Sequence, residues 1–66
     1  MDTETLFKYF KQAIEDEEKA HAFYLEAAAT ISDPEIKKTF EELAKTELSH
    51  SEMLKNKYKK LRELTS

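Results

Sequence analysis

The chain has 66 residues with no cysteine, no glycine and a single proline, and 38% of its residues are charged, for a net charge of −3. This composition excludes disulfides, zinc–thiolate sites and iron–sulfur clusters, and its acidic balance argues against nucleic-acid binding. The length allows one small domain, whose core is too small to make it very stable alone. No apolar run approaches membrane-spanning length, and residues 1–4 lack the basic-then-apolar layout of a signal peptide, so we expect a cytoplasmic protein with no membrane partner.

Good helix formers dominate the sequence, namely alanine, glutamate, lysine and leucine. They predict an all-α fold with one break, at Pro34 near the midpoint. We expect a single helical-hairpin domain over residues 1–66, with one helix over about 3–31, a turn at 32–33 and a second helix over about 34–64.

The first helix is expected to be capped by Asp2 or Thr3, with Glu4 in its first turn. Apolar and weakly polar residues then recur at helical spacing and share one sector of the helical wheel. These residues are Leu6, Phe7, Phe10, Ala13, Ile14, Ala20, His21, Tyr24, Ala27, Ala28 and Ile31. One charged residue, Glu17, lies near the centre of this apolar sector.

The turn is marked by Asp33 and Pro34, which have the sequence of an N-cap followed by the first helical position. Ser32 with Glu35 offers a capping box as the alternative. A proline disfavours helical conformation in the residue before it, which places the break here. So short a connection predicts an antiparallel hairpin.

The second helix also carries a carboxylate on its apolar face. Its apolar sector contains Ile36, Phe40, Leu43, Ala44, Leu54, Tyr58 and Leu61. Glu47 lies near the middle of this sector and His50 at its edge. Their Glu-x-x-His spacing places both side chains on one face, one turn apart, which suits two ligands of one metal ion.

The two central acids are expected at the same height in the hairpin. Glu17 precedes the turn at residue 32 by 15 residues, and Glu47 follows it by 15. A buried carboxylate costs several kcal/mol unless it is compensated. Metal ligation would compensate both acids. The alternative is that they reach the edge of the bundle or bond to tyrosine and lysine, with His50 a packed core histidine.

Two helices, each about 40 Å long, cannot cover two wide apolar stripes by pairing with each other alone. A second hairpin would complete a four-helix bundle, so a homodimer is the smallest assembly we expect, and a larger ring is also compatible. A twofold dimer would gather two copies of Glu17, Glu47 and His50, whose four carboxylates two divalent ions would neutralise. Oxygen and imidazole ligands suit iron, with manganese or zinc as alternatives.

Several motifs of the two helices occur together, in an order that is typical of a known family. They are Ala13-Ile14, Glu17, Ala20 and Phe23-Tyr24, then Asp33-Pro34, Phe40-Glu41-Glu42-Leu43-Ala44 and Glu47-Leu48-Ser49-His50. With these motifs the chain resembles the rubrerythrin branch of the ferritin-like superfamily over about Ala13 to Leu54. It is similar to the encapsulated ferritins, in which two-helix subunits build a di-iron site across a dimer interface. The resemblance therefore implies a ferritin-like four-helix bundle made of two chains.

By position, the resemblance implies that Glu17 is the ligand from the first helix, Glu47 the bridging carboxylate and His50 the terminal imidazole. It also places Tyr24 as an aromatic residue near the metals. His21 lies one turn from Glu17 and has no counterpart in the family pattern. We expect His21 and Tyr24 to be candidates for hydrogen bonding to the ligands.

The resemblance implies a di-iron ferroxidase that holds two iron ions per dimer and oxidises Fe(II) with O2 or peroxide. The first alternative is rubrerythrin-like scavenging of peroxide or O2, for which an external electron donor would be needed because this sequence has no cysteine. The second alternative is a non-catalytic helical assembly module. A shell protein that encloses the assembly is a further candidate partner.

Overall fold

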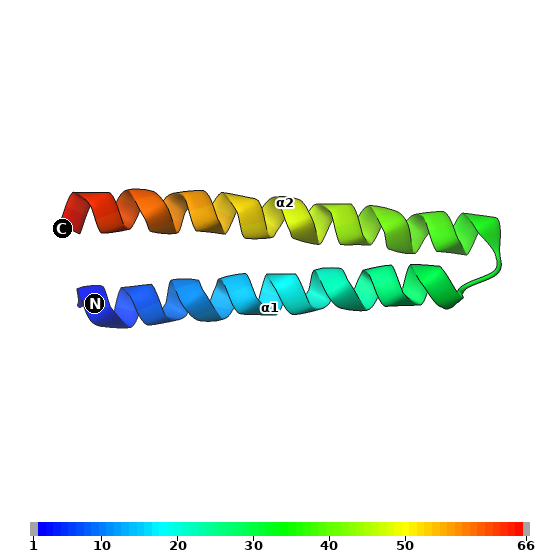
Figure 1. The fold of residues 1–66 in the computed structure, drawn as a ribbon, viewed down its shortest axis with the longest axis horizontal. Helices are drawn as coiled ribbons and strands as arrows, with labels where there is room; N and C mark the ends of the chain where they lie inside the picture. Colours follow the sequence, from blue (N-terminus) through cyan, green and yellow to red (C-terminus); the bar gives the residue numbers. More distant parts are fainter. Residues whose placement is uncertain (1, 66) are drawn as a thin grey trace.

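The computed structural model describes residues 2–65, which form two long antiparallel helices joined by a short turn (Figure 1). Helix α1 spans Thr3–Thr30 and helix α2 spans Pro34–Thr65. The hairpin is a rod of 49 × 15 × 14 Å. The expected all-α hairpin is confirmed, and α1 ends one residue before the predicted boundary while α2 ends one residue after it. Residues 1 and 66 of the expected domain lie outside the described part of the chain.

Each helix begins at an aspartate cap. The Asp2 side chain accepts a hydrogen bond from the Thr5 backbone N–H at 2.7 Å, so Asp2 and not Thr3 caps α1. This hydrogen bond lowers the pKa of the Asp2 carboxyl below its usual value. At the start of α2, Asp33 Oδ1 accepts from the backbone N–H groups of Glu35 and Ile36, at 3.0 Å each.

Replacing Asp33 with alanine is expected to lower the free energy of unfolding by about 1 kcal/mol, because two N–H groups at the start of α2 lose their acceptor. Urea unfolding at fixed protein concentration measures the change. Ser32→Ala is the matched control, since the side chain of Ser32 makes no cap in the described residues. Equal destabilisation by both substitutions would show that the capping role is wrongly assigned.

Small side chains fill the interface between the two helices. Within residues 2–65, the buried residues are Ala28, Ala44 and Ser51. Aromatic side chains pack across the helices on both sides of mid-length: the ring centroids of Phe7 and Tyr58 lie 5.4 Å apart near the open end, and those of Tyr24 and Phe40 lie 6.0 Å apart towards the turn. Ala44 and Ser51 flank Glu47 and His50 on α2, so the predicted site lies where α2 presents small buried side chains to α1.

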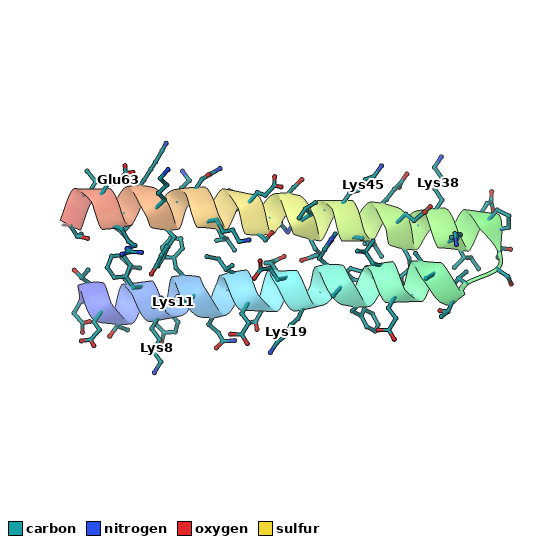
Figure 2. The ribbon with its side chains drawn as sticks, viewed as in Figure 1. Lys8, Lys11, Lys19, Lys38, Lys45 and Glu63 are labelled. Atoms are coloured by element: carbon teal, nitrogen blue, oxygen red, sulfur yellow. The ribbon has the colours of Figure 1, made fainter. Side chains whose placement is uncertain are left out.

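Many large apolar side chains remain exposed in the single hairpin. Those between 38% and 83% exposed are Tyr9, Phe23, Leu25, Ile36, Leu43, Leu48, Met53 and Leu64. The charged side chains of Lys8, Lys19, Lys38 and Lys45 point away from the partner helix, along the outer edges of the rod (Figure 2). Two faces lie between these edges, one on each side of the hairpin.

One broad face is identified by the ion pair between Lys55 and Glu18, with 2.7 Å between Nζ and Oε2. Leu48 precedes Lys55 by seven residues and Leu25 follows Glu18 by seven, so both leucines lie on this face. The pair is about half exposed, and such pairs contribute about 0–1 kcal/mol. We call this surface the ion-pair face.

The opposite surface, which we call the open face, carries a stripe of α2 residues spaced seven apart. Ile36, Leu43, His50, Lys57 and Leu64 fall on this spacing, so Lys57 interrupts the apolar part of the stripe between His50 and Leu64. His50 lies on the opposite flank of Glu47 from Leu48. On α1, Phe23 lies about 160° around the helix from Leu25 at 100° per residue, which places it on the open face. The dimer stays a prediction.

Across residues 2–65, neither helix combines the length and the apolar character needed to cross a membrane.

Candidate metal centre

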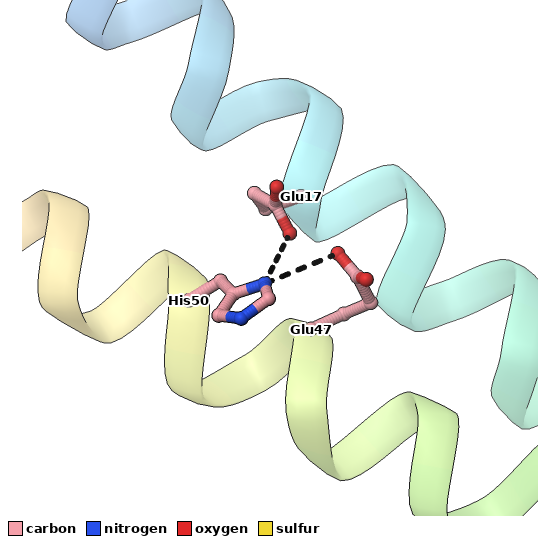
Figure 3. Close-up of side chains that lie close together, drawn as sticks. All are labelled: Glu17, Glu47 and His50. Atoms are coloured by element: carbon pink, nitrogen blue, oxygen red, sulfur yellow. Dashed lines mark ion pairs between the residues drawn. The ribbon is translucent and has the colours of Figure 1, made fainter.

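Three side chains from the two helices converge at mid-length of the hairpin (Figure 3). Glu17 comes from α1, and Glu47 and His50 come from α2. One ligand atom from each lies within 4.8 Å of the others. His50 Nδ1 is 3.4 Å from Glu17 Oε2 and 4.0 Å from Glu47 Oε2. The structure thus brings together the three residues that the sequence suggested as ligands.

These distances fit a shared cation. Two ligand atoms that bind one octahedral ion at about 2.1 Å lie roughly 3.0 to 4.2 Å apart. Both measured separations between His50 and the carboxylates lie within this range. Two carboxylates and an imidazole, without a thiolate, form a donor set that suits iron or manganese.

Glu17 supplies a second indication that a ligand is needed. Its Oε2 atom is buried and has no hydrogen-bond partner, although its side chain as a whole is 28% exposed. A buried acceptor without a partner costs about 1–3 kcal/mol, and more when it is charged. A cation between Glu17, Glu47 and His50 would satisfy this oxygen, so the residues present fit a metal ion.

Glu17 also affects the ionisation of Glu47. The pKa of the Glu47 carboxyl is raised above its usual value, first by a hydrogen bond with the Glu17 carboxyl, then by burial and by repulsion from Glu17. His50 opposes the shift. A divalent ion bound beside Glu47 would oppose this shift, because a positive charge favours the ionised carboxyl.

Metal-free protein is expected to lose stability as the pH rises. Because the pKa of Glu47 is raised by folding, the folded chain binds more protons than the unfolded chain between the two pKa values. The contribution of Glu47 to the free energy of unfolding is fully present below 4.5, the ordinary pKa of this carboxyl. It is lost as the pH rises through the pKa of Glu47 in the folded protein. Urea unfolding of metal-free protein from acidic to neutral pH measures this loss. Glu47→Gln should flatten the dependence, and an unchanged slope would contradict the assignment.

The two candidate supporting residues lie beside the site without bonding to its carboxylates. His21 Nδ1 lies 2.7 Å from the backbone carbonyl oxygen of Ala44, and His21 is outside the converging group. The Tyr24 ring packs against Phe23 and Phe40, with centroid distances of 5.5 and 6.0 Å. In the described part of the chain, neither side chain donates a hydrogen bond to Glu17 or Glu47.

Sequence patterns did not reveal the contact between His21 and Ala44, because its acceptor is a backbone carbonyl, which every residue has. They did indicate that His21 lies on the packed side of α1. The pairing of Glu18 with Lys55 was also missed, because both residues read as solvated surface.

Comparison with known proteins gives one match. The family model described as Rubrerythrin matches residues 8–66, a range that includes Glu17, Glu47 and His50. No curated protein and no solved structure matches the chain.

Proposed function

Because the chain belongs to the rubrerythrin family, a family of iron-binding, ferritin-like proteins, we propose that it is a di-iron ferroxidase that oxidises Fe(II) with O2 or peroxide. The observation that carries this proposal is the convergence of Glu17, Glu47 and His50 around a buried carboxylate oxygen that accepts no hydrogen bond. The same donors would accept manganese or zinc, so the identity of the metal is part of the proposal.

The active unit in this proposal is a homodimer. One hairpin offers three ligand residues, which leaves an octahedral ion incompletely coordinated. His50 lies on the open face, in the same stripe as the exposed Ile36 and Leu43, and its side chain is 49% exposed. A second copy packed on this face would cover the apolar stripe and bring a second set of ligands to the same level. The combined set would hold two ions whose charge of +4 balances four carboxylates.

The side chains have separate tasks in this centre. The carboxylates of Glu17 and Glu47 would hold the ions between the helices and would shift to hold the more highly charged product of oxidation. Glu47 would bind the ion in its ionised form, because a neighbouring cation favours the carboxylate. His50 would provide a neutral nitrogen ligand at the edge of the site nearest the open face. Bound iron itself would supply the redox chemistry, one electron from each ion.

Aerobic addition of Fe(II) to metal-free protein tests the proposal. We expect the absorbance of Fe(III) to grow much faster than in protein-free buffer, with a fast phase limited to the number of protein sites. Growth no faster than in buffer would remove the ferroxidase proposal.

Peroxide or O2 scavenging is the second candidate, and the match to the rubrerythrin family favours it. It would use the same residues but would need an external electron donor to return the iron to Fe(II). Turnover of peroxide that continues only while a reductant is supplied would support this function over ferroxidase activity. A protein that binds no iron under either condition would instead be a helical assembly module.

A further inference from the structure

The hydrogen bond between His21 and Ala44 connects the two helices directly beside the candidate metal centre. The His21 Nδ1 atom lies 2.7 Å from the Ala44 carbonyl oxygen. A carbonyl can only accept, so Nδ1 is the donor. Ala44 is 1% exposed, so water has little access to compete for this hydrogen bond.

The hydrogen bond between His21 and Ala44 lies one helical turn from a candidate metal ligand on each helix. His21 follows Glu17 by four residues, and Ala44 precedes Glu47 by three. Fixing His21 against Ala44 therefore fixes the height and rotation of Glu17 relative to Glu47 and His50. A slip of one residue would move Glu17 by about 1.5 Å along the axis. Metal sites tolerate errors of roughly 0.5 Å.

Other contacts specify this register weakly. The buried residues of the interface, Ala28, Ala44 and Ser51, are small, and the rings of Tyr24 and Phe40 pack with centroids 6.0 Å apart. Apolar contact of this kind is not directional. The pair of Lys55 and Glu18 is half exposed and held by flexible side chains. The second cross-helix bond to a backbone carbonyl, from Lys37 Nζ to the Ala28 oxygen at 3.0 Å, lies near the turn. It is about 15 Å along the helix from Glu47.

We propose that His21 is a positioning residue for the metal centre, whose hydrogen bond to the Ala44 carbonyl sets the register at which Glu17 stands opposite Glu47 and His50. This inference rests on the proposed function, because it assumes that these three residues bind metal. It assigns His21 to the alignment of the helices and not to the ligand set. Partners that hold metal ligands in place typically change metal affinity 10–100-fold when they are removed.

Titration with Co(II), followed by its visible absorption, tests the role of His21. Co(II) resists oxidation in air, and its spectrum reports the geometry of the ligands. His21→Leu removes the donor and should weaken Co(II) binding tenfold or more and alter the spectrum. His21→Asn carries an N–H group at the position of Nδ1, so it should restore affinity to within about threefold of the original protein and recover the spectrum.

Two further variants separate positioning from folding. Lys37→Met removes the other cross-helix bond of the same kind, and it should leave the Co(II) affinity and spectrum unchanged. His21→Met replaces His21→Leu if that variant lacks the helical content of the original protein by circular dichroism.

The outcomes distinguish this inference from the proposed function. The role of His21 would be overturned, and the metal site left intact, if His21→Leu bound Co(II) with the affinity and spectrum of the original protein. The same would follow if His21→Asn bound Co(II) no more tightly than His21→Leu. Absence of Co(II) and Fe(II) binding in the unmodified protein would overturn the proposed function and this inference together.

Discussion

Replacing Glu47 with alanine is expected to slow aerobic Fe(II) oxidation by at least about 100-fold, to near the rate in buffer. Loss of a residue that only supports a ligand costs 10–100-fold, and loss of the ligand should cost more. Glu47 has the least exposed of the three ligand side chains, at 20%. Its ligand oxygen lies within 4.8 Å of the ligand atoms of Glu17 and His50. Stopped-flow absorbance of Fe(III) after mixing with aerobic Fe(II) measures the rate.

The folded state of this variant should survive, which separates a lost site from a lost fold. Glu47 interacts unfavourably with Glu17 in the metal-free protein, as its raised pKa indicates. Removing it relieves this repulsion, so metal-free Glu47→Ala should be at least as stable at neutral pH as the original protein. Circular dichroism and urea unfolding check this expectation.

Glu52→Ala is the matched control, since Glu52 is an exposed glutamate on the same helix, five residues away. It should oxidise Fe(II) at the original rate. If Glu47→Ala is as active as Glu52→Ala, iron is not oxidised at the site formed by Glu17, Glu47 and His50.

The hairpin could be predicted because several short stretches of the sequence each indicate it independently. Pro34 interrupts an otherwise continuous helical pattern, and the turn is too short for any other arrangement. The equal height of Glu17 and Glu47 then follows from the constant rise of a helix. The choice between Asp2 and Thr3, or between Ser32 and Asp33, could not be made in advance, because adjacent residues compete for the same N–H groups.

Features of the site that depend on how the helices cross were not accessible from sequence. The sequence pattern placed His21 on the packed face but could not indicate that its ring would reach the Ala44 carbonyl. Nor could it indicate that one oxygen of Glu17 would be buried without accepting a hydrogen bond. Both depend on rotations of the helices by a fraction of a turn, to which a pattern of apolar residues is insensitive.

The second large effect concerns assembly: Leu43→Glu is expected to prevent dimerisation and, with it, rapid Fe(II) oxidation. Leu43 is 38% exposed in the single hairpin and precedes His50 by seven residues on the open face. A leucine contributes about 2 kcal/mol when it is fully buried, so the 38% of Leu43 that is still exposed contributes roughly 0.8 kcal/mol. Twofold symmetry doubles this loss to about 1.5 kcal/mol, or roughly tenfold in the dissociation constant. The unpaired glutamate introduced at both symmetric positions adds a cost of several kcal/mol when the interface closes. Sedimentation velocity measures the mass, and aerobic Fe(II) addition measures the activity.

Leu48→Glu is the matched control, because Leu48 is similarly exposed, at 43%, but lies on the ion-pair face with Lys55. It should assemble and oxidise iron as the original protein does. Fe(II) or Co(II) should also tighten the dimer, because ions that bridge ligands from both chains stabilise only the associated state. If Leu43→Glu remains dimeric and active while Leu48→Glu dissociates, the ion-pair face is the true interface. His50 would then lie on the outer surface of the assembly, and each hairpin would have to bind metal with its own three ligands.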